Sequence, residues 1–177
     1  MEITISACQT AWGWVGTAVS PEGLLATGLP VTSPEEALAP LRRRWPGAQE
    51  GTNARLAALH EKLQRYFLGE DVDLSTESLD LRRATDFQAR VWELVRSIPR
   101  GQVRSYRWVA RQAGSPQGAR AVGRAMATNP FPIVVPCHRV VGQDGHLTGF
   151  GGGLDMKSRL LAMEGARVVL LDDYRIT

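Results

Sequence analysis

The first third of the chain alternates apolar and polar residues before it changes to the spacing of helices. Residues 3–7, 12–19 and 23–29 place apolar side chains at every second position, and turn-forming residues separate them. This alternation predicts three antiparallel strands. Two helices follow. Ser33 is the predicted N-cap of the first, with Glu36 closing a capping box. The predicted apolar face of this first helix consists of Leu38, Leu41 and Trp45. The second helix begins near Asn53, and its predicted apolar face consists of Leu56, Leu59, Leu63, Tyr66 and Phe67.

The second half of the chain has a helical spacing that is interrupted several times. A capping box from Thr85 to Gln88 opens one predicted helix, and Ser105 caps a shorter helix that Gly114 ends. A further helix is predicted over 115–128. Two short helices around a turn that contains glycine are typical of a helix-turn-helix, although many such helical hairpins bind nothing.

The last predicted elements lie around the second cysteine. A short apolar strand is expected over 131–135, and a hairpin or wing over 138–150. A final helix has Asp155 as its predicted cap and Gly165 after its end.

An acidic, weakly patterned segment, 68–84, separates the two halves of the chain. We therefore expect an α+β protein with an α/β domain over 1–82 and a mostly helical domain over 83–177 that carries the helix-turn-helix. A chain of 177 residues is long enough for two domains that each bury a modest core without disulfides. Since the start of the chain contains neither a basic leader nor a long apolar segment, we expect a soluble, cytoplasmic protein with no membrane attachment.

Charge is distributed unevenly between these two parts. Residues 1–82 hold 7 Lys and Arg against 11 Asp and Glu, net −4, whereas residues 83–177 hold 14 against 7, net +7. Such a basic region fits a surface that binds a polyanion, and the alternative is a solvated helix face in an arginine-rich chain. Between positions 88 and 124 the chain has one acidic residue, Glu93, and eight arginines: Arg90, Arg96, Arg100, Arg104, Arg107, Arg111, Arg120 and Arg124.

The motif PCHRV at 136–140 points to nucleophilic chemistry. Cys137 is one of two cysteines, and His138 follows it directly. A thiol attacks as the thiolate, so it needs a base or a dipole nearby at neutral pH. Because adjacent side chains diverge, we expect a water or a turn between the two groups. The alternative for Cys137 is a buried structural thiol.

Glu164 is the candidate partner for the imidazole. An acid near a helix C-terminus is unfavourable for the helix dipole, which indicates that Glu164 has a partner; an exposed carboxylate is the alternative. The histidines and cysteines lack the spacing of a metal site, so we expect neither a metal nor a cofactor.

Several segments together carry a resemblance to a known family. FQARVWELVRSIPRGQVRSY, RAVGRAMATNP, IVVPCHRVV and LTGFGGGLDMKSRLLAMEG follow one another over residues 86–165. They resemble the O6-alkylguanine-DNA alkyltransferases, the methylated-DNA–protein-cysteine methyltransferases. The resemblance implies an RNase H-like N-terminal domain before a winged helix-turn-helix domain, and a monomer that repairs double-stranded DNA from the minor groove.

The resemblance also implies roles for individual residues. Cys137 would accept the alkyl group from O6-alkylguanine once and irreversibly, with O4-alkylthymine left open as a second substrate. His138 would deprotonate the thiol through water, Glu164 would orient His138, and Asn129 would order the active-site turn. Arg120 would enter the base stack as the nucleotide flips out.

The remaining implied residues form the binding surface. Tyr106 would press on the neighbouring phosphate, and Arg124 belongs to the basic face. The pocket would be walled by Tyr106, Met126, Val140 and the loop with Phe150, Gly151 and Gly152. Some relatives carry Tyr and Ser where this chain has Phe150 and Gly151, which widens the pocket and removes a hydroxyl donor.

Two other functions fit the same features. A helix-turn-helix protein could recognise alkylated DNA without transfer, as alkyltransferase-like relatives that lack the cysteine do. A thiol hydrolase would instead turn over. The presence of Cys137 favours transfer, because a binding protein needs no activated thiol.

Overall fold

The computed structural model describes residues 1–142, 147, 149–166, 168–169 and 175–176. By their contacts these residues form two units. Unit 1 consists of residues 1–83 together with 130–134, and unit 2 of residues 84–129 together with 135–177. The segment 130–134 thus lies within the range predicted for the second domain but packs with the first unit.

Unit 1 is built on a four-stranded sheet in the order β3-β2-β1-β4. Strands β1 (Thr4–Thr10), β2 (Gly13–Ser20) and β3 (Gly23–Thr27) pair antiparallel, which confirms the three strands predicted from the alternation. Strand β4 (Gln49–Glu50) pairs parallel with β1 and was not predicted, because two residues carry no periodicity.

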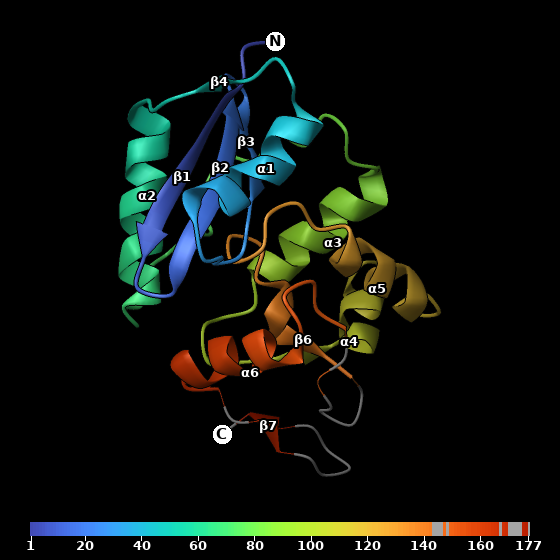
Figure 1. Cartoon of the computed structure of the whole chain (residues 1–177). Helices are drawn as coiled ribbons and strands as arrows, with labels where there is room; N and C mark the ends of the chain where they lie inside the picture. The colour runs from blue at the N-terminus through green and yellow to red at the C-terminus, as the bar shows by residue number, and fades with distance from the viewer. Residues whose placement is uncertain (143–146, 148, 167, 170–174, 177) are drawn as a thin grey trace. The chain divides into compact units, whose positions relative to one another are not determined.

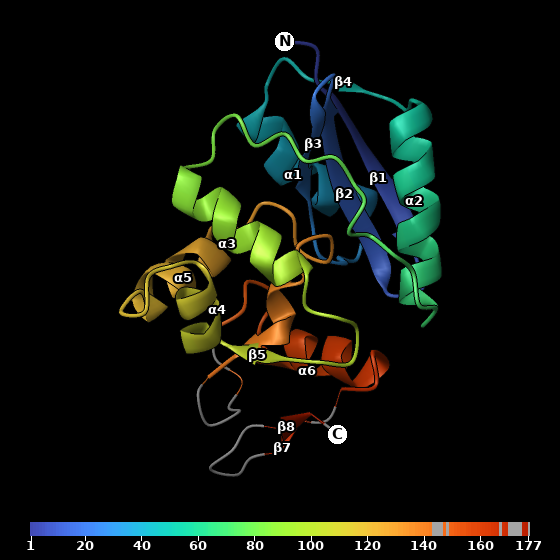
Figure 2. The same cartoon turned by 180° about the vertical axis from the view of Figure 1, so that it is seen from behind.

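Helices α1 (Pro34–Arg44) and α2 (Ala54–Phe67) cover opposite faces of this sheet (Figures 1 and 2). Ala18 of β2 belongs to the same buried cluster as Leu38 and Leu41 of α1. Its neighbour Thr17 faces the other way and hydrogen-bonds His60 of α2 at 2.8 Å. Alternation along one strand therefore supplies both halves of the core.

Both helices begin where they were predicted to begin, with one difference at the predicted cap of α1. Ser33 accepts from the N–H of Glu36, and Asn53 accepts from the N–H of Leu56. The Glu36 carboxylate, however, accepts from the backbone and hydroxyl of Thr32 and does not complete the predicted capping box with Ser33.

Unit 2 consists of four α-helices among its described residues, with short strands between them (Figure 1). The helices are α3 (Asp86–Arg96), α4 (Tyr106–Gln112), α5 (Ala119–Ala127) and α6 (Leu154–Met163). The strands are β5 (Arg104–Ser105), which pairs parallel with β6 (Val140–Val141), and β7 (Val168–Val169), which pairs antiparallel with β8 (Arg175–Ile176). None of the described helices is long and apolar enough to cross a membrane.

Two caps predicted in unit 2 are confirmed and two are wrong. Thr85 and Gln88 form the predicted capping box of α3, and Ser105 caps α4. Helix α5 does not begin at Ser115; Gly118 is its N-cap and makes no side-chain bond. Helix α6 likewise begins after Gly153, so Asp155 lies in its first turn and is not its cap.

The segment around the second cysteine also differs from the prediction. Residues 131–135 form turns and isolated bridges instead of a strand, and Cys137–Arg139 form a single 3-10 turn, η1. Pro132 interrupts the apolar run, and Pro130 and Pro136 flank it, so these three positions lack the N–H groups that a central strand needs. Of the predicted hairpin or wing over 138–150, residues 143–146 and 148 lie outside the described residues, and residues 140–141 pair parallel with β5.

Candidate active site

Cys137 sits directly after a tight turn that Pro136 creates. Pro136 has φ −76° and ψ 67°, the geometry of an inverse γ-turn, and the Cys137 N–H donates to the Val135 carbonyl at 2.7 Å. The Asn129 side chain donates to the same carbonyl at 3.0 Å. Both lone pairs of one oxygen are therefore used, and Asn129 at the end of α5 is tied to the backbone of Cys137.

The environment of the thiol has opposing effects on its ionisation. Burial raises the pKa of Cys137, while a hydrogen bond from Asn129 and the positive charge of Lys157 act to lower it. Only 8% of Cys137 is exposed. The raised pKa means that the resting thiol is protonated and that attack requires a base.

His138 and Glu164 form a buried pair beside the cysteine. The His138 Nε2 lies 2.9 Å from Glu164 Oε2, and both side chains are fully buried. Burial lowers the pKa of His138, and the Glu164 carboxylate opposes this shift. Because a carboxylate only accepts, the neutral imidazole carries its hydrogen on Nε2. Its Nδ1 is buried and has no hydrogen-bond partner among the described residues, so this nitrogen can accept a proton.

Arg139 holds the carboxylate of that pair in place. Its Nε and Nη2 donate to the two oxygens of Glu164 at 2.9 and 2.8 Å, and its Nη1 donates to the Ile98 carbonyl at 2.7 Å. Although burial opposes it, hydrogen bonds from His138 and Arg139 hold the pKa of Glu164 well below its usual range. Glu164 therefore stays ionised, and it orients the imidazole while Arg139 orients Glu164.

Lys157 is the second cation of the site and is fully buried. Its Nζ donates to the Val140 carbonyl at 2.7 Å and lies 6.0 Å from the centre of the Tyr106 ring. Burial lowers the pKa of Lys157 to about 8, an effect that the Cys137 thiolate opposes. The ammonium group is still charged at neutral pH and favours the ionised form of the thiol.

A cavity of about 530 Å³ opens onto Cys137. The predicted residues Tyr106, Arg120, Met126, Phe150 and Gly151 line it, together with small residues of α5 and Gly149. An added Cβ at Gly151 would meet nothing within 4 Å, so the glycine leaves space that a serine would partly fill. The cavity has room for a planar base and a substituent next to the sulfur.

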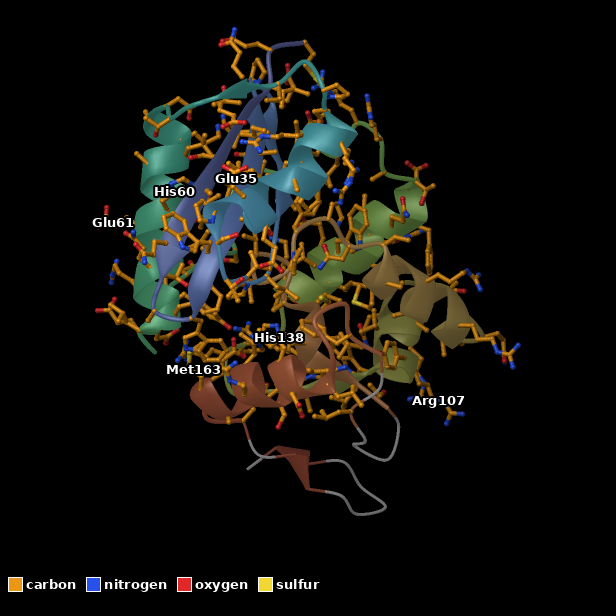
Figure 3. The ribbon with its side chains drawn as sticks, in the orientation of Figure 1. Glu35, His60, Glu61, Arg107, His138 and Met163 are labelled. Atoms are coloured by element: carbon orange, nitrogen blue, oxygen red, sulfur yellow. The ribbon has the colours of Figure 1, made fainter. Side chains whose placement is uncertain are left out.

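Three predicted binding residues do not line this cavity. Val140 is fully buried and offers its carbonyl to Lys157, while Gly152 is exposed beyond the lining loop. Arg124 is exposed on α5, and Arg107 projects away from α4 (Figure 3). These arginines lie on an open surface, as a basic face requires.

Two residues of the site were missed by the sequence reasoning. Arg139 belongs to the motif PCHRV without a predicted role of its own, and no role was predicted for Lys157. A signal for Lys157 was present, because Lys157, Leu160, Leu161 and Glu164 follow the i, i+3, i+4, i+7 spacing of a buried helix face. A lysine on such a face indicates a buried cation with a specific partner.

The described residues contain no group of three or more His, Cys, Asp and Glu side chains arranged to hold a metal. The groups described at the site are a thiol, a neutral imidazole, a paired carboxylate and a buried ammonium group.

Comparisons with known proteins agree on one family. Residues 86–166 match the 6-O-methylguanine DNA methyltransferase, DNA binding domain. The methylated-DNA–protein-cysteine methyltransferase of Mycobacterium tuberculosis H37Rv is 46% identical over 136 residues, covering 75% of this chain and 77% of the relative. That of Salmonella typhimurium is 42% identical over 130 residues, covering 73% and 75%.

Solved structures extend the likeness to nearly the whole chain. The crystal structure of Mycobacterium tuberculosis OGT in complex with DNA has a TM-score of 0.76 and 37% identity, covering 92% of each chain. The O6-methylguanine-DNA methyltransferase of Pyrococcus kodakaraensis, at 24% identity and a TM-score of 0.70, shares the fold.

Proposed function

Because the chain belongs to the family of methylated-DNA–protein-cysteine methyltransferases, we propose that it repairs DNA by moving an alkyl group from O6 of guanine to Cys137. One observation carries this assignment. The sulfur opens into a cavity of about 530 Å³ and adjoins a buried His138–Glu164 pair whose hydrogen bond is 2.9 Å long.

The transfer is a single displacement at the alkyl carbon. The Cys137 thiol gives its proton, through a bridging water, to Nδ1 of His138, and the adjacent Glu164 stabilises the imidazolium. The thiolate then forms a bond to carbon as the carbon–O6 bond breaks, and guanine leaves with the bonding electrons and is protonated from solvent. The product is a thioether, a poor leaving group, so each molecule acts once.

The target base must leave the duplex to reach this sulfur. Arg120 of α5 and Tyr106 both line the cavity, and Arg120 is exposed, so that its side chain can take the place of the extruded base. The small residues of α5 let its backbone approach the minor groove closely. Exposed arginines, among them Arg107 and Arg124, supply contacts to phosphates.

The cavity also bears on the choice of adduct. Phe150 and Gly151 offer no side-chain hydroxyl to O6, which leaves backbone N–H groups as donors. The open space at Gly151 favours a wide range of alkyl groups on guanine and leaves room for O4-alkylthymine. We further propose that the protein works as a monomer in the cytoplasm, on double-stranded DNA.

The test is stoichiometric transfer from an oligonucleotide duplex that contains O6-methylguanine. Intact mass should show a gain of one methyl group per protein, and peptide mapping should place it on Cys137. Cys137→Ala should bind the duplex and gain nothing. Cys8→Ala is the matched control and should react like the wild type, because burial raises the pKa of Cys8 to about 11 and keeps that thiol protonated.

Each other outcome identifies a different function. Binding by the wild type without any mass gain would identify a recognition protein. Release of more than one equivalent of repaired DNA per protein would identify a turnover enzyme. Transfer by Cys137→Ala would exclude Cys137 as the acceptor.

A further inference from the structure

The segment Pro130–Val134 is an excursion of the chain between two parts of the candidate site. Asn129 and Val135, on either side of it, belong to unit 2, whereas the segment itself packs within unit 1. The bond from the Asn129 side chain to the Val135 carbonyl, 3.0 Å long, closes this excursion at its base. We call residues 130–134 the excursion loop.

Thr27, the last residue of β3, holds the loop by two hydrogen bonds. Its N–H donates to the Pro130 carbonyl at 2.9 Å, and its hydroxyl donates to the Pro132 carbonyl at 2.8 Å. Thr27 is 7% exposed, so water has little access to the two donors and does not readily replace either hydrogen bond. The two carbonyls lie on either side of Phe131, which is 1% exposed, and the loop is therefore fixed along its first half.

The second half of the loop holds an unfavourable backbone conformation. Ile133 has φ +75° and is the one residue other than glycine with a positive φ among those the structure describes. A β-branched side chain strongly disfavours this region. Such a conformation persists only where the surroundings impose it. Ile133 is 3% exposed, and the prolines on its N-terminal side leave few alternatives for the chain.

We propose that Thr27 is a positioning residue for alkyl transfer: its two hydrogen bonds to the excursion loop hold Ile133 in the left-handed conformation and thereby fix the Val135 carbonyl that Asn129 and the Cys137 N–H share. This inference rests on the proposed function for its readout and adds a residue of the N-terminal unit to the reaction. Without the anchor, the loop relaxes at Ile133 and the sulfur loses its fixed direction.

The decisive variants are Thr27→Val and Thr17→Val. Thr27→Val keeps the shape and the backbone bond to Pro130 but removes the hydroxyl bond to Pro132. Thr17 is the matched control, because it pairs with Thr27 across β2 and β3 and its buried hydroxyl bonds Ser6 and His60, away from the loop. Thr27→Ser keeps both bonds and should restore the wild-type behaviour.

We expect Thr27→Val to lower the single-turnover rate at saturating O6-methylguanine duplex about tenfold, since small misplacements of reacting groups are costly. Its dissociation constant for the duplex should not change. Thr17→Val should match the wild type in both quantities. An unchanged rate in Thr27→Val, or an equal loss in Thr17→Val, would overturn the proposal.

Carbamidomethylation of Cys137 by iodoacetamide separates this proposal from the proposed function. The reaction needs no DNA, and Cys137 is identified by its peptide. Thr27→Val should shift the pH profile of this reaction to higher pH, because the hydrogen bond from Asn129 to the thiolate is no longer held. If the wild type transfers no methyl group but the shift is present, the proposed function fails and the positioning role stands.

The backbone strain has its own test. Ile133→Gly should melt at least about 2 °C above Ile133→Ala, because glycine accepts a positive φ and alanine does not. At the neighbouring Val134 the order should be the usual one, with Val134→Ala above Val134→Gly. If the alanine variant melted above the glycine variant at both positions, the backbone of Ile133 would not be strained.

Should Thr27→Val not fold, amide exchange of the wild type decides. If the anchor controls the turn, the amide protons of Thr27 and Cys137 exchange in one opening event at similar rates. Exchange of the Cys137 amide more than about tenfold faster would overturn the proposal.

Discussion

Lys157 is a cation that the fold keeps away from water beside a nucleophile. The Val140 carbonyl and the face of the Tyr106 ring offset part of the cost of its burial. Its pKa, lowered to about 8, still leaves the ammonium group charged at neutral pH, and this charge lowers the pKa of Cys137. Lys157 thus complements the proton acceptor His138 by stabilising the product of deprotonation.

Replacing Lys157 by Met should therefore make Cys137 harder to ionise. We expect carbamidomethylation of Cys137 by iodoacetamide at pH 7 to slow about tenfold and its pH profile to move to higher pH, since the reactive species is the thiolate. The measurement is the rate of the modified Cys137 peptide from pH 6 to 10.

Lys62→Met is the matched control for that prediction. Lys62 is the other lysine of the chain, and its ion pair with Glu77 at 2.8 Å lies in unit 1. Its replacement should leave the profile unchanged. A profile that stays in place in Lys157→Met would mean that the lysine acts on the fold alone.

At this scale the sequence predicted side chains better than backbone. The neighbours Cys137 and His138 and the unfavourable place of Glu164 at a helix end pointed to a group that the structure brings together. The shared Val135 carbonyl and the left-handed Ile133 were not predicted, because the apolar run 131–135 is as typical of a strand as of a strained loop.

The approach of α1 to the sheet depends on one glycine. A Cβ added at Gly16 would lie 2.4 Å from the Ala37 carbonyl of α1. Gly16→Ala should therefore destabilise the protein by about 1–3 kcal/mol, because the helix must move away from β2. Urea denaturation measures this loss.

Gly47→Ala is the control for the packing argument, since an added Cβ at Gly47 meets nothing within 4 Å. It should change the stability by less than about 0.5 kcal/mol. Equal losses in both variants would show that the contact between helix and strand is not the cause of the loss at Gly16.

Helices were predictable where their start is encoded locally. Asn53, Thr85 and Ser105 each cap a predicted helix. In each case a side-chain oxygen accepts a hydrogen bond from the backbone N–H three residues later, so the signal lies within a few residues of the sequence. Helices α5 and α6 begin at Gly118 and Gly153, which offer no such side chain. The parallel strands β5 and β6 contain two residues each and pair residues that are 36 positions apart. No local sequence pattern therefore predicts this pairing.

Both units contain a carboxylate that is held ionised, and this sets the response of the whole molecule to acid. Hydrogen bonds from Arg82 and Ser20 hold the pKa of Asp80 in unit 1 well below its usual range, as His138 and Arg139 do for Glu164 in unit 2. A folded pKa below the unfolded value adds stability that is complete above the unfolded pKa and is lost as the pH falls.

We therefore expect the melting temperature of the wild type to fall steeply below about pH 5. Asp80→Asn and Glu164→Gln should each flatten this fall while lowering stability at pH 7. Thermal melts at pH 3 to 7 measure it. Glu61→Gln is the control, because this side chain points away from α2 into solvent (Figure 3). A wild-type slope in both test variants would contradict the assignment.

The excursion loop finally affects the order in which the molecule can be made. The hydroxyl of Thr27 reaches a carbonyl 105 positions later in the chain. During synthesis from the N-terminus the strands and both helices of unit 1 emerge first, yet α3, α4 and α5 must follow before residues 130–134 leave the ribosome. The contacts of Thr27 at the end of β3 therefore cannot form until residues 130–134 have been synthesised, after α3, α4 and α5 of unit 2. Such distant contacts slow folding, and for this chain they make completion of the N-terminal unit a late event of translation.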